Sequence, residues 1–248
     1  MRRPLAALAL GLSLGAAGCT LGHGTTREPV VDEVVLRGVR AVDGDELREK
    51  LATHGPVSRP GALGIVLRER RRLDPDALAV DRRRIEAFYR ERGYYRARVE
   101  NVEVEEAGRG LVKVVFHVSE GEPVRITTVD VKGLEAAPDA ARYATKLPVR
   151  PGDVFTEEAY DAARAQLLAS LLSNGWAAAE VRQGAVVLPS AGTAEVTYEV
   201  SPGPRYRFGP IFVAGTATVP RDLVRDQASV AVKTGEWWDE SKLAAAQA

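Results

Sequence analysis

An internal repeat at one fixed spacing constrains this 248-residue chain more than any other feature. Three pairs of glycines share that spacing, namely Gly93 and Gly175, Gly121 and Gly203, and Gly133 and Gly215. An alternating apolar run recurs at the same offset, as Val112, Val114, Phe116 and Val118 and then as Ala194, Val196, Tyr198 and Val200. Matches in separate segments at one offset indicate tandem domains of similar structure.

The second repeat predicts the order β-α-α-β-β, which is an α+β fold. β-branched residues over 124–134 favour a strand, and residues 138–146 favour a short helix. A longer helix is expected to begin after Thr156, a residue type that caps helix N-termini, because apolar residues follow on one helical face. Residues 177–188 and 194–200 predict two further strands, the last with one wet face.

The first and third repeats vary this pattern. The first is longer, and we expect its additional residues to form a loop over 54–61 because of the glycine, proline and serine content there. The third predicts a strand over 211–215 and helices over 220–227 and 239–248, but has no final two strands. We therefore expect the chain to be a fragment of a longer protein.

The N-terminus has the pattern of a secretory signal. Two arginines precede an apolar stretch over 5–17, which is too short to span a bilayer. Small residues then lead to Cys19, the only cysteine, in a sequence similar to a bacterial lipobox. We expect residues 1–19 to be a lipoprotein signal peptide with Cys19 lipidated, and residues 20–29 to form a flexible tether. The alternative is an ordinary signal cleaved near Ala17.

Composition and motifs argue against catalysis, cofactors and nucleic acid. The formal net charge is zero, whereas phosphate binding favours a basic excess. The histidines are not spaced as metal ligands, so no metal site is predicted for His23, His54 and His117. No nucleophile elbow or phosphate loop is present. A cluster of carboxylates is interpreted as a solvated strand end rather than an acid–base site: Glu103, Glu105 and Glu106.

One stretch is locally basic. Residues 64–98 contain 11 arginines and six acidic residues. The arginines are at positions 68, 70, 71, 72, 82, 83, 84, 90, 92, 96 and 98. Two interpretations remain open: the polar face of a helix, or a surface that contacts anionic lipid headgroups or an acidic partner.

Three repeated motifs, in this order within the repeats, resemble those of the POTRA domain. The strand–glycine motif occurs at 129–133 and 211–215, the turn before the long helix at 151–155 and 234–238, and the helix-ending Gly–aromatic pair at 93–94 and 175–176. The first repeat departs from the pattern, because it has Leu73-Asp74-Pro75 in place of the Pro-Gly-Asp turn. The similarity points to the BamA/TamA group, which carries POTRA domains in front of a C-terminal membrane β-barrel.

This resemblance implies tandem domains, each with a three-stranded mixed sheet covered by two helices on one face. The boundaries that follow are 30–122 for a first domain, 123–203 for a second and 204–248 for an incomplete third. It also implies a non-enzymatic protein at the periplasmic face of the outer membrane. Its expected role is to receive unfolded outer-membrane proteins or other assembly-complex subunits, and its membrane link would be a barrel absent from this sequence or the N-terminal lipid.

In POTRA domains the second strand is commonly an edge strand, and an exposed edge can pair with an extended peptide. The resemblance therefore places partner binding at residues 96–105 and 177–188. The positions expected to pair are Arg96, Ala97, Arg98, Val99, Ala185, Val186, Val187 and Leu188. Two other roles remain open: a periplasmic adaptor lipoprotein, and the POTRA part of a two-partner-type secretion transporter.

Overall fold

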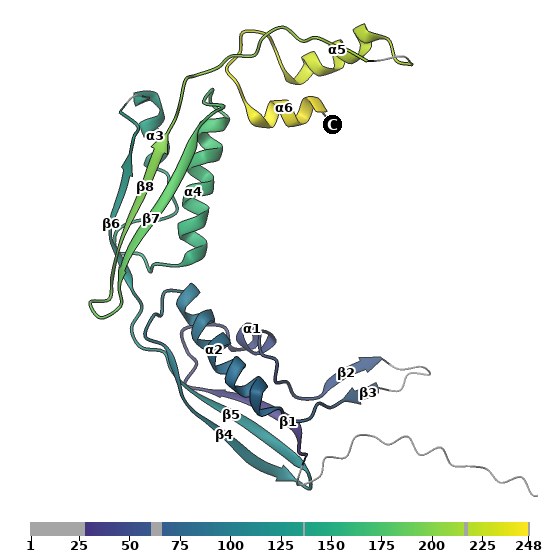
Figure 1. Ribbon diagram of the computed structural model, residues 1–248, viewed down its shortest axis with the longest axis vertical. Coiled ribbons are helices and arrows are strands. Elements are labelled where there is room, and N and C mark those ends of the chain that lie inside the picture. The colour runs from purple at the N-terminus through teal and green to yellow at the C-terminus, as the bar shows by residue number, and fades with distance from the viewer. Residues whose placement is uncertain (1–27, 61–65, 136, 216–217, 248) are drawn as a thin grey trace, which may run out of the picture.

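The computed structural model describes residues 28–60, 66–135, 137–215 and 218–247, and it shows two similar α+β units followed by a helical segment (Figure 1). The signal, Cys19, His23 and most of the tether lie outside the described residues. The first unit contains β1 (Val30–Arg37), α1 (Gly44–Glu49), β2 (Val57–Pro60), β3 (Val66–Glu69), α2 (Pro75–Glu91), β4 (Arg98–Gly108) and β5 (Leu111–Ser119).

The second unit repeats this order without the β2–β3 pair. It contains β6 (Arg125–Lys132), a 3-10 turn (Pro138–Ala140), α3 (Ala141–Ala144), α4 (Glu157–Leu172), β7 (Glu180–Leu188) and β8 (Thr193–Ser201). The chain continues into α5 (Arg221–Ala231) and α6 (Glu240–Gln247).

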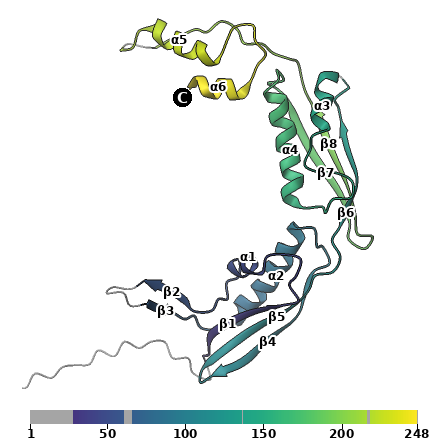
Figure 2. The ribbon, with the colours of Figure 1, turned by 180° about the vertical axis from the view of Figure 1, so that it is seen from behind.

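Each unit has a three-stranded mixed sheet. The strand orders are β1-β5-β4 and β6-β8-β7, and in both sheets the central strand is parallel to the first strand and antiparallel to the edge strand beside it. The long helices α2 and α4 each lie on one face of their sheet (Figures 1 and 2). The predicted fold class, tandem α+β units with mixed sheets and helices, is therefore confirmed.

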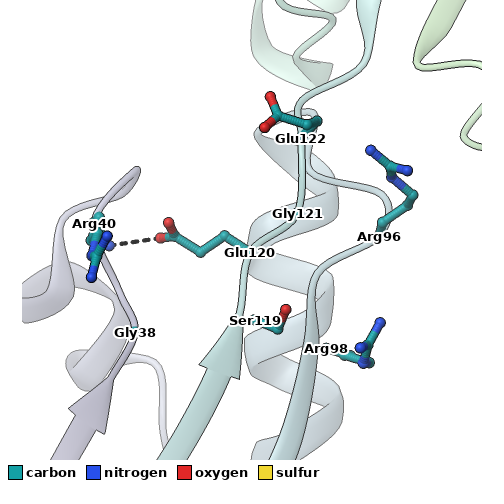
Figure 3. Close-up of a pocket in the computed structure, with 8 residues that line it drawn as sticks. All are labelled: Gly38, Arg40, Arg96, Arg98, Ser119, Glu120, Gly121 and Glu122. Atoms are coloured by element: carbon teal, nitrogen blue, oxygen red, sulfur yellow. Dashed lines mark hydrogen bonds between the residues drawn. The ribbon is translucent and has the colours of Figure 1, made fainter.

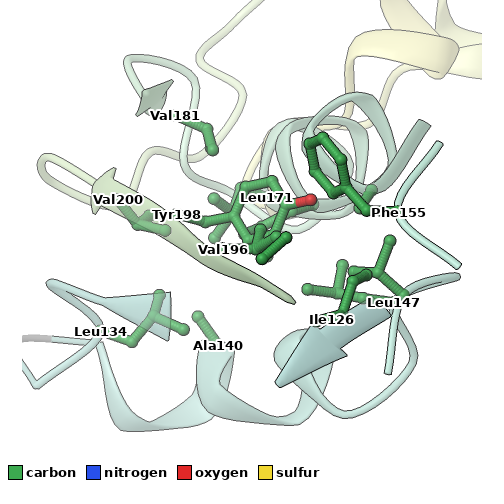
Figure 4. Close-up of a cluster of buried hydrophobic side chains, with 14 of the residues drawn as sticks. Ile126, Leu134, Ala140, Leu147, Phe155, Leu171, Val181, Val196, Tyr198 and Val200 are labelled. Carbon is green, nitrogen blue, oxygen red and sulfur yellow. The ribbon is translucent and has the colours of Figure 1, made fainter. Parts of the chain in front are cut away.

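The core of the second unit lies between the β6-β8-β7 sheet and α4 (Figure 4). The alternating residues of β8 face this core, and each is at most 5% exposed: Ala194, Val196, Tyr198 and Val200. From α4, Leu167 and Leu171 are fully buried against them. Burying one such side chain stabilises the fold by roughly 1.5–3 kcal/mol. The alternating apolar side chains of the strand and the apolar side chains on one face of the helix therefore pack together in one layer.

The ends of α4 follow from local sequence. The Thr156 side chain accepts a hydrogen bond from the Ala159 N–H at 3.2 Å, which satisfies one donor that has no partner inside the helix. Beyond the last turn, Gly175 adopts a φ of +103°, and the Trp176 N–H donates to the Leu171 carbonyl at 3.2 Å. A left-handed residue at this point ends the helix, as the glycine in the sequence indicates.

The loop predicted over residues 54–61 is only partly a loop. The additional residues of the first unit form a two-stranded antiparallel hairpin, β2–β3, with Val57 opposite Glu69 and Pro60 opposite Val66. Residue 61 of the predicted loop lies outside the described residues, and the glycine and proline content did not reveal that residues 57–60 pair with residues 66–69. The hairpin extends away from the three-stranded sheet (Figures 1 and 2).

The strand predicted over residues 211–215 is wrong. That segment has no regular secondary structure, and the nearby extended backbone makes only an isolated bridge between Arg207 and Trp237. A strand is stabilised by its ladder, and the described residues after Ser201 include no neighbouring strand for this segment. The two helices predicted there are present as α5 and α6.

Candidate functional site: the open edges of the two sheets

Each sheet has one edge that the chain itself covers. In the first unit the Val31 N–H donates to the Arg71 carbonyl at 2.9 Å, and in the second the Ile126 N–H donates to the Asp153 carbonyl at 2.9 Å. The segments before α2 and α4 therefore lie along β1 and β6. The other edges, β4 and β7, are the ones with backbone groups available for pairing.

The structure divides the predicted binding residues between different settings. All four predicted residues of the second unit lie in β7: Ala185, Val186, Val187 and Leu188. Arg98 and Val99 begin β4, whereas Arg96 and Ala97 lie in the turn before it. In Figure 3, Arg96 and Arg98 lie on one side of the end of β5, with Arg40 and Glu120 on the other. Residues 96–99 are therefore not a continuous pairing edge.

The direction of the β7 backbone follows from its partner strand β8. The Gly192 carbonyl accepts from the Arg125 N–H at 2.9 Å, and the Ala194 carbonyl accepts from the Thr127 hydroxyl at 3.1 Å, so both point toward the β6 side. At the C-terminal end of β8, the Val200 carbonyl also points toward the β6 side, since a Cβ on Gly133, the residue that follows β6, would lie 1.9 Å from its oxygen.

Every second residue of β8, counted from Ala194, therefore directs its N–H and C=O groups toward β6. Its partner on β7 forms no hydrogen bond with β8 and directs its own N–H and C=O groups outward, toward the open edge. The outward set is Val181, Gln183, Ala185 and Val187. The neighbours Val186 and Leu188, whose backbone groups face β8, expose 58% and 50% of their surface. The β7–β8 ladder has no register shift, so β7 offers four evenly spaced outward positions beside exposed apolar side chains.

The β4 edge is different. Its register with β5 shifts between Val99 and Asn101 and again between Glu106 and Gly108. Bulges and charged side chains both disfavour strand addition. At the spacing of the repeat, Glu103-Val104-Glu105-Glu106 of the first unit corresponds to Ala185-Val186-Val187-Leu188 of the second. That contrast was available in the sequence as a signal, whereas the bulges were not.

A carboxylate at the end of β5 organises the side of the first unit shown in Figure 3. Glu120 Oε1 accepts from the Arg40 N–H at 2.7 Å, the Ala41 N–H at 2.8 Å and the Tyr89 hydroxyl at 2.7 Å. Partial burial alone would raise the pKa of Glu120, but these three donors hold it below its usual value. Burial and the bond to Glu120 raise the pKa of the Tyr89 hydroxyl.

Much of the basic stretch serves the fold. Arg84 pairs with the fully buried Asp81 at 3.1 Å, and Arg92 pairs with Glu46 at 2.6 Å while its guanidinium stacks on Phe88. The interpretation as the polar side of a helix therefore accounts for several of these arginines. The lipid or acidic-partner interpretation stays a prediction for those that point to solvent.

Among the residues that the structure describes, no three metal-binding side chains gather at one place. Within the same residues, no helix combines the length and the apolar character needed to cross a bilayer.

Comparison with known proteins gives one family and several structural neighbours. The POTRA family model, described as a surface antigen variable number repeat, matches residues 29–121 and 124–203. The curated proteins contain no match. Among solved structures, the Haemophilus influenzae BamA POTRA3-5 fragment is 15% identical, with 88% of this chain and 83% of that chain covered and a TM-score of 0.46.

Two further neighbours have lower TM-scores. The POTRA1-3 part of the periplasmic domain of Omp85 from Anabaena is 17% identical, with 69% and 65% coverage of this chain and that chain and a TM-score of 0.33. CdiB from Escherichia coli is 14% identical, with 79% of this chain and 31% of that chain covered and a TM-score of 0.34. The two stretches matched by the family model together make up more than half of the sequence, and each contains one of the two mixed sheets; the chain belongs to the POTRA family.

Proposed function

We propose that this protein is a periplasmic binding module of an outer-membrane assembly or secretion factor, and that it receives extended strands of its partners along β7. Family membership supports the general role. The observation that carries the specific one is the uninterrupted outward edge of β7, with four outward positions between Val181 and Val187. Main-chain pairing gives affinity that depends little on the partner's sequence, which suits a factor handling many unfolded proteins.

The partner we infer is an amphipathic β-strand. Strands of outer-membrane barrels alternate apolar and polar residues over about ten positions. Val186 and Leu188 lie on the outer face of β7 and are half exposed, so an added strand would bury apolar surface there as well as backbone groups. Gly184 directs its backbone groups to β8, and a Cβ placed on it would meet no atom within 4 Å, so the outer face of β7 is uncovered at this residue.

The direct test compares two neighbouring proline variants. Val187 directs its N–H outward, so Val187→Pro is expected to keep the fold and weaken binding by at least about tenfold, because a donor is lost and the ring blocks the incoming strand. Val186 directs its N–H to β8, so Val186→Pro is expected instead to destabilise the second unit by about 2 kcal/mol or more.

Binding is measured by fluorescence anisotropy with a labelled peptide of about ten alternating valine and threonine residues. A peptide of the same composition with two central prolines is the control ligand. Circular dichroism and urea unfolding report the fold of both variants. A folded Val187→Pro protein that binds the alternating peptide as tightly as the wild type would rule out the β7 edge as the binding site.

A further inference from the structure

Two side chains of α2 bond to the backbone of β4 at its outer edge. The Arg82 guanidinium donates to the Val99 carbonyl at 2.9 Å, and Glu86 Oε1 accepts from the Val99 N–H at 3.3 Å. Both backbone groups of one strand residue are thus occupied by side chains from the helix that covers the sheet. No other residue of β4 is held in this way in the described part of the chain.

Val99 is a position where an added strand would have to pair. It lies opposite Val118, whose carbonyl is turned toward the β1 side, since a Cβ on Gly38 would lie 2.1 Å from that oxygen. The backbone groups of Val99 therefore point away from β5, toward the open edge. Arg82 and Glu86 occupy the hydrogen-bonding groups that an incoming strand would use and also fill the space beside them.

The second unit lacks this arrangement. At the spacing of the repeat, Arg82 corresponds to Arg164, Glu86 to Leu168 and Val99 to Val181. Leu168 has no acceptor, and it packs against the apolar core instead. Among the described side chains of α4, none bonds to the Val181 backbone. The helix that covers the sheet thus bonds to both backbone groups of Val99 in the first unit and to neither backbone group of Val181 in the described part of the second.

We propose that Arg82 and Glu86 form a clamp that closes the β4 edge, so that strand addition is directed to β7. The clamp makes these two residues determinants of which edge binds. The inference rests on the proposed function for its biological meaning, but its structural content, a protected Val99 backbone, is independent of β7. The register shifts of β4 act in the same direction, because they limit its regular outward run to Val102, Val104 and Glu106.

The test opens the clamp in a protein whose β7 edge is blocked. In the Val187→Pro background, Glu86→Leu copies the residue of the second unit and is expected to restore peptide affinity by about tenfold over Val187→Pro alone. On the wild-type background the same change is expected to raise the number of bound peptides from one to two per chain. The peptide and the anisotropy measurement are those described above.

Three comparisons make the result specific. Glu86→Gln keeps an oxygen that accepts from the Val99 N–H and is expected to behave as the wild type. Arg83→Ala removes an exposed neighbouring charge outside the clamp and is expected to gain no binding. Arg82→Ala frees the Val99 carbonyl and serves as the second opening variant should Glu86→Leu fail to fold. Hydrogen exchange at the Val99 amide is expected to accelerate about tenfold in Glu86→Leu.

The outcomes separate the two proposals. If the wild type binds peptide through β7 but neither opening variant gains binding, the clamp is overturned and the proposed function stands. If the wild type shows no binding while Glu86→Leu binds, the clamp is supported and β7 is not the binding edge. If no variant binds the peptide, both are overturned. Unchanged exchange at Val99 in Glu86→Leu would also overturn the clamp.

Discussion

At the level of single residues, the Glu120 carboxylate joins three parts of the first unit. It accepts from two backbone N–H groups after β1 and from the Tyr89 hydroxyl on α2. Its hydrogen bonds favour the ionised form, so the pKa of Glu120 is lower in the folded chain than in the unfolded chain. The equivalent position in the next repeat is Pro202, so the second unit has no corresponding group.

This shift predicts acid sensitivity. Because the folded pKa is lowered, Glu120 contributes stability above the unfolded value of about 4.5, and that contribution is lost as the pH falls below it. Glu120→Gln is expected to lower the free energy of unfolding by about 1–3 kcal/mol at pH 7 and to lose less stability between pH 5 and pH 3 than the wild type. Urea unfolding over this pH range measures both; parallel curves for the two proteins would contradict the prediction.

At the level of secondary-structure elements, each parallel strand ends at a glycine pressed against the central strand. Gly38 and Gly133 adopt φ values of +86° and +85°, and a Cβ on either would lie about 2 Å from a carbonyl oxygen of β5 or β8. Only glycine allows this close approach together with a left-handed backbone. At Gly38 and Gly133 the glycine is thus a requirement of sheet geometry, whereas Gly215 follows no strand and a Cβ there would meet no atom within 4 Å.

Gly133→Ala is therefore expected to destabilise the second unit by at least about 2 kcal/mol, from the backbone conformation and the clash combined. Gly184→Ala is the matched control: Gly184 lies inside β7, and a Cβ there meets no atom within 4 Å. That variant is expected to leave stability unchanged or to raise it by up to about 1 kcal/mol. Thermal unfolding compares the two, and equal melting temperatures would contradict the explanation.

Across the molecule as a whole, the two joints between successive units repeat one bond. The Val124 N–H donates to the Gly93 carbonyl at 2.8 Å, and the Tyr206 N–H donates to the Gly175 carbonyl at 2.7 Å. At the second joint, the Arg205 guanidinium lies between two indole rings, 4.5 Å from the centre of Trp176 and 3.9 Å from that of Trp237. Helix-ending glycines therefore also serve as attachment points for the next unit.

Arg205→Ala is expected to loosen the second joint without unfolding the second unit. Two cation–π contacts of about 0.5–1 kcal/mol each are lost together with the hydrogen bond from the Arg205 guanidinium to the Asn174 carbonyl, so the Tyr206 amide should exchange roughly tenfold faster while the amides of β8 keep their protection. Arg221→Ala, an exposed arginine at the start of α5, is the control and should change neither. Equal exchange at Tyr206 in the wild type and in Arg205→Ala would show that the stack does not hold the joint.

Much of the fold could be predicted from the sequence because the determining signals are local and repeated. Alternation along residues 194–200 defined a strand with one buried face, and Thr156 and Gly175 marked the ends of α4. Local patterns failed where pairing partners decide the structure. The segment 211–215 has strand-forming residues, but the described residues provide no neighbouring strand for it, whereas the loop-like insertion of the first unit pairs with itself.

The repeat, the α+β class and the family resemblance could all be read from the sequence, because spacing, periodicity and capping residues are properties of short segments. The charge contrast between the two edges is also present in the sequence, whereas the bulges of β4 and the bonds to the Val99 backbone emerged only once the chain was folded. Whether a backbone N–H faces a neighbouring strand, a helix side chain or open space depends on register and on bulges, which arise from contacts between distant segments. Val99 and Val181 are equivalent by spacing, yet one is held by Arg82 and Glu86 while the other faces outward without such a clamp.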